Sequence, residues 1–376
     1  MEGKACHQCN YNAGKRDWLP FGFSRDGKLL RMTGPRTFAS VLPDALAQID
    51  FDAVATRVQG VVKRTPLVSL TPELVRGLGG NKRAIERLQR IDLHLKLECL
   101  QVTGSFKARG AWNQIAQLTD EQRKRGVVTT SSGNHGRALA WAAKRAGVPA
   151  TICMPADAYA NKIEACRELG AEVRLGETRP LTDAICMQLA EEGAVLIHPY
   201  DAVRTIEGTG TVGLEIALDL PDVDIVITPV GGGGLISGVA LALRSKLGPN
   251  VQVIGVEPSG AATLSRGLEA GAPVDLPNIQ TEVQGLCPLN VGALNIAAAQ
   301  NAVNRVVELE DEPIFTAQAL LVNHCGLTVE PAGAATLAAV LFTDLLDELP
   351  AFNRVAIVVS GGNPAPQQLL AIRSLS

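Results

Sequence analysis

The sequence predicts an α/β protein whose parallel, twisted sheets are covered by helices. From Asp50 onward, short runs of apolar and β-branched residues alternate with longer helix-like runs. This alternation is typical of parallel sheets, because each crossover between parallel strands needs a helix that packs on the sheet. Several strand-like runs also end in turns of small residues, at the edge where open sheets of this class bind ligands.

Nine segments carry the strand pattern, and helix-like runs separate most of them. The predicted strands are Asp92–Glu98, Gly126–Thr130, Ala150–Met154, Glu172–Leu175, Val195–His198, Asp224–Val230, Val251–Glu257, Arg305–Leu309 and Arg354–Val359. The segment Asn81–Arg90 is basic and helix-prone, and we expect it to be a surface excursion. Residues 1–45 lack the alternation, so we expect a poorly ordered or loosely docked N-terminal extension.

Composition points away from nucleic acid and membrane partners. The 376 residues carry a net charge of −3, and 46% of them are hydrophobic, enough for a sizeable core. The sequence has no basic block, no apolar run long enough to span a membrane and no apolar signal-peptide core. We therefore expect a cytoplasmic protein.

Most of the eight cysteines are scattered through apolar segments, as expected of reduced core residues. Cys6-His-Gln-Cys9 is the exception. It could be half a zinc site or a redox pair, but no second pair of ligands lies nearby in the sequence. We favour an extension without metal.

The segment Thr103-Gly-Ser-Phe-Lys-Ala-Arg109 places Lys107 at the start of a predicted helix, among Phe106, Ala108 and Trp112. A half-buried amine can serve as a covalent anchor and as a base. A lysine whose stem lies along apolar surface would give the same pattern. Three further segments favour the chemical role.

The first is Ser131-Ser132-Gly133-Asn134-His135-Gly136, between the strand 126–130 and the Ala-rich helix 137–146. Backbone N–H groups at such a helix start suit a carboxylate or a phosphate. An ordinary turn capped by Ser or Asn would look the same.

The second segment is the run Gly231, Gly232, Gly233 and Gly234, followed by Leu235. It joins the strand 224–230 to an apolar helix. Glycines at this junction let the backbone wrap an anion, and the helix start adds its positive end. No Gly-Lys-Ser/Thr follows, so the run is not a nucleotide-binding P-loop.

The third segment is Ser360-Gly361-Gly362-Asn363, directly after the strand 354–359. It is either a strand-ending turn or a place where a serine hydroxyl faces a cofactor ring.

Together and in this order, the four segments resemble the β-family (fold type II) of pyridoxal phosphate enzymes. The nearest match is the serine/threonine dehydratase and serine racemase branch. Further segments share this resemblance: Arg64–Leu67, Leu95–Glu98, His198–Pro199, Gly255–Pro258 and Val329–Gly333. The resemblance implies a tryptophan synthase β-like fold with pyridoxal 5'-phosphate as cofactor. It also implies a homodimer, a large domain (46–125 plus 202–376) and a small mobile domain (126–201).

The resemblance implies a role for each motif. Lys107, beside Phe106, would hold the cofactor as a Schiff base and then take the Cα proton. The cofactor's phosphate would lie on Gly231–Leu235, its ring oxygen on Asn134 and its ring nitrogen on Ser360. The carboxylate of an amino-acid substrate would bind the turn formed by Ser131, Ser132, Gly133, Asn134 and His135.

A neutral hydroxyl at Ser360 cannot keep the cofactor's pyridine protonated as an aspartate would, which favours loss of the β-hydroxyl. We therefore expect an ammonia-lyase that converts L-threonine and/or L-serine to 2-oxobutyrate or pyruvate plus ammonia. Ser132 leaves a serine racemase open, because a hydroxyl there can reprotonate Cα on the face opposite Lys107. A dehydratase for 3-hydroxyaspartate or phenylserine also stays open, as does a catalytically silent scaffold.

The chain departs from this branch at two places. Glu257 and Ala261 match divalent-cation ligands of relatives, but Thr263 stands where an acidic ligand usually falls, so we expect no occupied metal site. Gln284 replaces an aspartate, which leaves the substrate preference open. Arg137 and Arg179 are the sequence candidates for binding a second substrate carboxylate.

Overall fold

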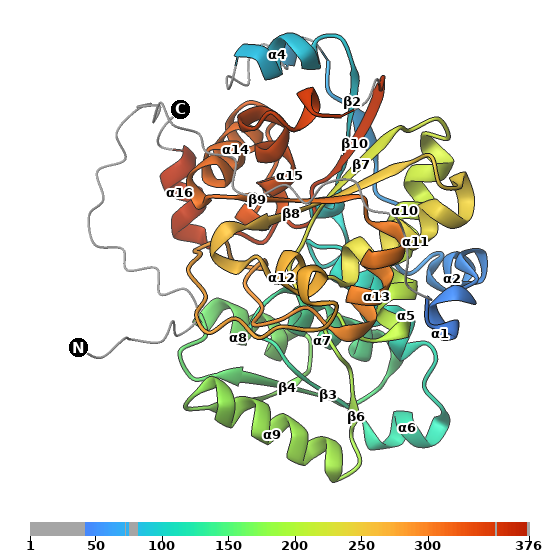
Figure 1. Cartoon of the computed structure of the whole chain (residues 1–376). Coiled ribbons are helices and arrows are strands. Elements are labelled where there is room, and N and C mark those ends of the chain that lie inside the picture. The colour runs from blue at the N-terminus through green and yellow to red at the C-terminus, as the bar shows by residue number, and fades with distance from the viewer. Residues whose placement is uncertain (1–41, 72, 75–81, 350–351, 374–376) are drawn as a thin grey trace.

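The computed structural model describes residues 42–71, 73–74, 82–349 and 352–373, and its strands form two sheets (Figure 1). The six-stranded sheet has the order β1-β2-β10-β7-β8-β9, formed by Leu67–Ser69, Asp92–Lys96, Arg354–Val358, Ile225–Pro229, Gln252–Pro258 and Arg305–Leu309. The four-stranded sheet has the order β5-β4-β3-β6, formed by Glu172–Gly176, Ala150–Pro155, Val127–Thr130 and Val195–Leu196. β1 runs antiparallel to β2, and every other pair in these described sheets is parallel.

Helices connect the strands and cover the sheets (Figure 1). In the first half of the chain they are α1 (Asp44–Ala47), α2 (Phe51–Val58), α4 (Lys82–Leu88), α5 (Lys107–Ile115), α6 (Asp120–Arg125), α7 (Asn134–Ala146), α8 (Ala160–Glu168) and α9 (Arg179–Glu191). In the second half they are α10 (Val203–Asp219), α11 (Gly234–Leu247), α12 (Thr263–Ala270), α13 (Ala293–Ala302), α14 (Asp311–Asn323), α15 (Pro331–Phe342) and α16 (Pro366–Arg373). The described residues also include three short 3-10 helices: η1 (Glu98–Leu100), η2 (Ser259–Ala261) and η3 (Leu345–Asp347).

The predicted α/β class with parallel sheets is confirmed. All nine predicted strands are present, with ends within two residues of those predicted. The sequence pattern does not predict β1, because a three-residue edge strand with two exposed residues carries no alternation.

The six-stranded sheet is buried on both faces, as parallel sheets require. In β7, Ile225 and Ile227 belong to the apolar cluster that includes α14 and α15, while Val226 belongs to the cluster that includes α10 and α11. Successive side chains point to opposite faces of a strand, so the uninterrupted apolar run of β7 serves two cores. No helix in the described part of the chain combines the length and apolarity needed to cross a bilayer.

Every strand of the smaller sheet comes from residues 127–196. The division into a large domain and a small mobile domain stays a prediction. Residues 1–41, which include Cys6 and Cys9, lie outside the described residues, and α1 begins inside the predicted extension. The six cysteines of the described residues form no disulfide, and four of them, Cys99, Cys153, Cys166 and Cys186, are buried.

The predicted surface excursion is an amphipathic helix anchored on the core. α4 exposes Lys82, Arg83 and Glu86, but Leu88 is only 1% exposed and belongs to the cluster of α14 and α15. One face of α4 is therefore exposed to solvent, and the opposite face packs on the core.

We predict that Leu88→Ala lowers the free energy of unfolding by about 2–5 kcal/mol, because it removes buried methyl groups and leaves a cavity. Leu100→Ala is the control, since Leu100 is 44% exposed. Denaturant titration of both variants checks this. If both variants lost the same small amount of unfolding free energy, α4 would not be part of the core.

Candidate active site

The backbone brings Lys107 and Ser360 together. Lys107 is the first residue of α5, and Ser105 forms an isolated antiparallel bridge with Gly361, just beyond β10. The Phe106 N–H donates to the Ser360 carbonyl oxygen at 3.2 Å. The segments 103–109 and 360–363, two of the four predicted motifs, therefore lie side by side in the site.

The Lys107 amine is half-buried and faces a carbonyl group. Its Nζ donates to the Pro199 carbonyl oxygen at 2.8 Å and lies 5.1 Å from the centre of the Phe106 ring. Burial lowers the pKa of Lys107 to about 8, because an ammonium group loses hydration inside the protein. A larger share of the amine is therefore neutral near neutral pH than for a surface lysine.

Asn134, the first residue of α7, is held by two side chains that lie far away in the sequence. Its Nδ2 donates to Glu330 Oε1 at 2.6 Å, and its Oδ1 accepts from Asn363 Nδ2 at 2.7 Å. Burial raises the pKa of Glu330 to about 7, although the charge of Lys162 and the bond from Asn134 act in the opposite direction. The Asn134 amide thus has a fixed orientation.

The Ser131–His135 turn is shaped by its own first hydroxyl. Ser131 Oγ accepts from the N–H groups of Gly133 and Gly136 at 3.3 and 3.1 Å. The His135 ring is buried, and its Nε2 lies 3.2 Å from the Ile197 carbonyl oxygen. Burial, followed by the nearby Lys107 charge, lowers the pKa of His135 to about 3, so the ring is neutral. His135 can therefore contribute to an anion site through its backbone N–H at the start of α7, and not through a charged ring.

The glycine run Gly231–Gly234 leads from β7 into α11, as predicted, and Gly234 is the first residue of the helix. Gly233 has φ +88°, in the left-handed region that favours glycine, and a Cβ on Gly232 would overlap the Tyr200 ring. Asn295 Nδ2 donates to the Gly232 carbonyl oxygen at 2.8 Å. The start of the 14-residue helix α11 supplies backbone N–H groups and a positive dipole end for a phosphate.

Two buried hydroxyls and Ser360 complete the fit to a cofactor. Ser360 is 3% exposed, and its hydroxyl donates to the Ala332 carbonyl oxygen at 3.3 Å. The hydroxyls of Ser105 and Thr228 are buried without a hydrogen-bond partner among the described residues. They lie on the segments that lead to Lys107 and to the glycine run. A ligand with several acceptor oxygens would satisfy such groups.

Sequence reasoning missed Glu330, Asn363, Pro199 and Asn295 as individual site residues. Glu330 and Asn363 lie inside two of the family-like segments, and a carboxylate directly before an apolar, proline-initiated helix is the one available signal. The Pro199 carbonyl and the Asn295 amide carry no signal, because each acts on a group more than 60 residues away.

The two candidate cations for an acidic substrate differ in position. Arg137 Nη1 donates to Asn363 Oδ1 at 2.8 Å, so this guanidinium borders the Asn134 group. Arg179 forms an exposed ion pair with Asp183 at 3.0 Å. Gln284 Oε1 accepts from Lys162 Nζ at 3.0 Å, which joins α8 to the loop after α12.

The carboxylate of Glu257 is buried and satisfied by α12. It accepts from the N–H groups of Leu264 and Ser265 at 2.6 and 3.0 Å and from the Ser265 hydroxyl at 3.0 Å. Thr263 Oγ1 lies 3.4 Å from the same carboxylate. No cluster of three or more His, Cys, Asp or Glu side chains suited to a metal ion exists within the described residues.

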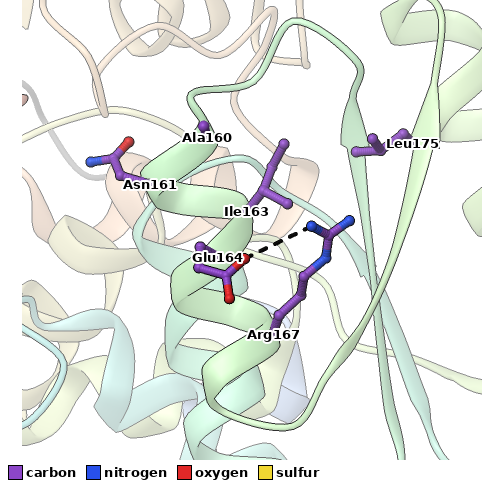
Figure 2. Close-up of a pocket in the computed structure, with 6 residues that line it drawn as sticks. All are labelled: Ala160, Asn161, Ile163, Glu164, Arg167 and Leu175. Atoms are coloured by element: carbon purple, nitrogen blue, oxygen red, sulfur yellow. Dashed lines mark ion pairs between the residues drawn. The ribbon is translucent and has the colours of Figure 1, made fainter.

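A surface hollow of about 480 Å³ lies elsewhere, between α8 and β5 (Figure 2). Ile163 and Leu175 give it apolar walls, and Glu164 and Arg167 form an ion pair at 3.9 Å on its rim. None of its lining residues belongs to the groups around Lys107.

Comparison with known proteins identifies the family of this chain. The family model for the pyridoxal-phosphate dependent enzyme matches residues 59–361. The chain is 43% identical over 274 residues to the L-threonine ammonia-lyase of Thermotoga maritima, covering 72% of this chain and 67% of that protein. It is 35% identical over 312 residues to the serine racemase of Oryza sativa subsp. indica, covering 82% and 88%.

Among solved structures, the processed form of threonine deaminase isoform 2 from Solanum lycopersicum matches with a TM-score of 0.81 at 30% identity, covering 92% of this chain and 97% of that one. The chain belongs to the fold type II pyridoxal-phosphate dependent enzymes, in the serine/threonine dehydratase and racemase branch, and its cofactor is pyridoxal 5'-phosphate.

Proposed function

We propose that this protein is an ammonia-lyase that eliminates water from L-threonine and/or L-serine. The observation that carries the proposal is the Lys107 amine, which is half-buried, has a lowered pKa and lies beside the segment that holds Ser360. The identity of 43% to a threonine ammonia-lyase supports the same reaction.

The cofactor, when bound, supplies an electron sink for the electron pair left at Cα after the proton departs. Lys107 anchors it and then accepts the Cα proton at Nζ, a role that needs a neutral amine. The Pro199 carbonyl, 2.8 Å from Nζ, orients the amine. One side chain thus serves as both anchor and base.

Other residues bind and orient. Gly231–Leu235 and the start of α11 would hold the phosphate. Asn134, whose amide is fixed by Glu330 and Asn363, would face the ring oxygen. The backbone N–H groups of Ser132, Asn134 and His135 would hold the substrate carboxylate at the start of α7, while that of Gly133 donates to Ser131 Oγ.

Elimination is favoured over racemisation by the partner of the ring nitrogen. To donate to the ring nitrogen, the Ser360 hydroxyl would turn away from the Ala332 carbonyl oxygen, and such a neutral group would support a protonated ring less well than a carboxylate does. With a weaker electron sink, the electron pair left at Cα would more readily expel the β-hydroxyl group than wait for a new proton. The released enamine tautomerises and takes up water, giving ammonia and 2-oxobutyrate from threonine or pyruvate from serine.

Serine racemisation is the second candidate, because the chain carries Ser132 in the substrate turn and is 35% identical to a serine racemase. A dehydratase for 3-hydroxyaspartate is a narrower candidate, and Arg137 beside Asn363 is its supporting observation.

We predict that Lys107→Ala abolishes ammonia release and the visible absorbance of the Schiff base between Lys107 and the cofactor, because anchor and base are one group. Lys144→Ala is the control, since Lys144 is an exposed lysine that donates to a backbone carbonyl oxygen. A folded Lys107→Ala variant with wild-type ammonia release would contradict the assignment.

For Ser132→Ala we predict a moderate fall in turnover through poorer substrate positioning, while the wild type forms little D-serine from L-serine. Chiral chromatography of the wild-type reaction measures this directly. Abundant D-serine in the wild type, lost selectively in Ser132→Ala, would assign Ser132 as the opposite-face acid and the enzyme as a racemase.

Treatment with a chelator should leave the rate and the melting temperature unchanged. Glu257 is already satisfied by four protein donors, and Thr263 supplies no carboxylate for a hard cation. A loss of activity that Mg²⁺ or Ca²⁺ restores would show that other oxygen atoms complete a site.

A further inference from the structure

Helix α10 lies between the two helices that carry the cofactor anchors. α5 begins with Lys107, and α11 begins with Gly234 at the end of the glycine run. Both helices pack against α10, and the three lie together in the fold (Figure 1). The separation of the Lys107 amine from the phosphate-binding turn therefore depends on how each helix sits on α10.

Glycines allow an unusually close approach on both sides of α10. Towards α5, a Cβ on Gly208 would lie 2.6 Å from the Arg109 carbonyl oxygen and 2.7 Å from Gly110 Cα. Towards α11, a Cβ on Gly213 would lie 2.5 Å from the Val239 carbonyl oxygen. Backbone touches backbone at both crossings, which leaves little freedom in the interhelical distance.

Hydrogen bonds fix the two crossings in rotation and register. On the α11 side, Thr209 Oγ1 donates to the Gly234 carbonyl oxygen at 2.6 Å. On the α5 side, Arg109 Nη1 and Nη2 donate to the two carboxylate oxygens of Glu215 at 2.6 and 2.9 Å. Arg109 also donates from Nε and Nη2 to Glu98 at 2.9 and 2.7 Å. A planar fork held on two carboxylates tolerates little rotation.

Separating the charged side chains at the crossing of α5 and α10 would leave buried charges without partners, which costs free energy. Arg109, Glu98 and Lys96 have no exposed surface, and Lys96 Nζ donates to Glu215 Oε2 at 2.6 Å. Two cations thus meet two carboxylates. Buried ion pairs add little net stability compared with apolar residues of the same size, because desolvation offsets their attraction. Their hydrogen bonds are directional, however, so these ion pairs can fix the relative position of α5 and α10.

We propose that Arg109, Glu215 and Thr209 are positioning residues that hold the Lys107 amine at a set distance from the phosphate-binding turn, with α10 as the spacer. The inference rests on the proposed roles of Lys107 and Gly231–Gly234 as the two anchors. A shift of about 1 Å between anchor points is enough to slow catalysis by about 100-fold.

The test compares Arg109→Lys, which keeps the charge but loses the fork, with Thr209→Val, which keeps the shape but loses the bond to Gly234. Asp219→Asn is the matched control, because it breaks an exposed ion pair with Arg64 at the last residue of α10. The holoenzymes are reduced with borohydride, and peptide mass mapping gives the fraction of Lys107 that carries the cofactor. Cofactor dissociation, kcat, KM and thermal unfolding are measured in parallel.

Both positioning variants are expected to unfold cooperatively, to release cofactor more readily and to show less labelled Lys107. In addition, kcat should fall by about 100-fold for Arg109→Lys with KM little changed. Asp219→Asn should match the wild type. A folded variant with a lower melting temperature but wild-type labelling, cofactor retention and kcat would overturn the proposal, since its role would then be structural only.

If Arg109→Lys fails to fold, Thr209→Val decides alone by the same measurements. Labelling and cofactor release do not depend on the substrate. A wild type that carries cofactor on Lys107 but releases no ammonia from threonine or serine would therefore refute the proposed reaction and leave this test valid. Labelling of a different lysine in the wild type would overturn the inference itself.

Discussion

The guanidinium of Arg109 has no exposed surface, and the geometry around the site depends on the carboxylates that balance its charge. Glu98 follows β2 and Glu215 lies on α10, so the charge is neutralised only when α5, β2 and α10 have assembled. An arginine buried with one partner missing would cost several kcal/mol. Partly assembled arrangements of these three elements are therefore disfavoured, and Lys107, two residues before Arg109, shares that constraint.

Burial acts on two further groups in opposite directions. It lowers the pKa of Lys107 to about 8 and raises that of Glu330 to about 7, because it disfavours the charged form of each. Burial thus brings the pKa values of an amine and of a carboxyl group close to neutral pH. The carboxyl group holds Asn134 in place, and the lowered pKa of the amine suits the proton transfer at Cα that is proposed for Lys107.

Part of the site is predictable from local sequence. Lys107, the glycine run and the Ser131–His135 turn stand at junctions between a strand or turn and a helix, and the N–H groups of a helix start belong to a few consecutive residues. The contacts that orient these groups are not predictable in this way. Glu330 accepts a hydrogen bond from Asn134, 196 positions away in the sequence. Leu88 becomes buried only when α4 packs against α15.

The sequence by itself determined the α/β class, nine of the ten described strands and the positions of the motifs that are proposed to anchor the cofactor, because each depends on the spacing of neighbouring residues. Only the tertiary structure decided that Pro199 faces the Lys107 amine, that α12 satisfies Glu257 and that Gly208 lets α5 touch α10. These are contacts between distant segments. The sequence specifies which side-chain and backbone groups are present. Close packing and charge balance in the folded chain determine which of these groups contact each other.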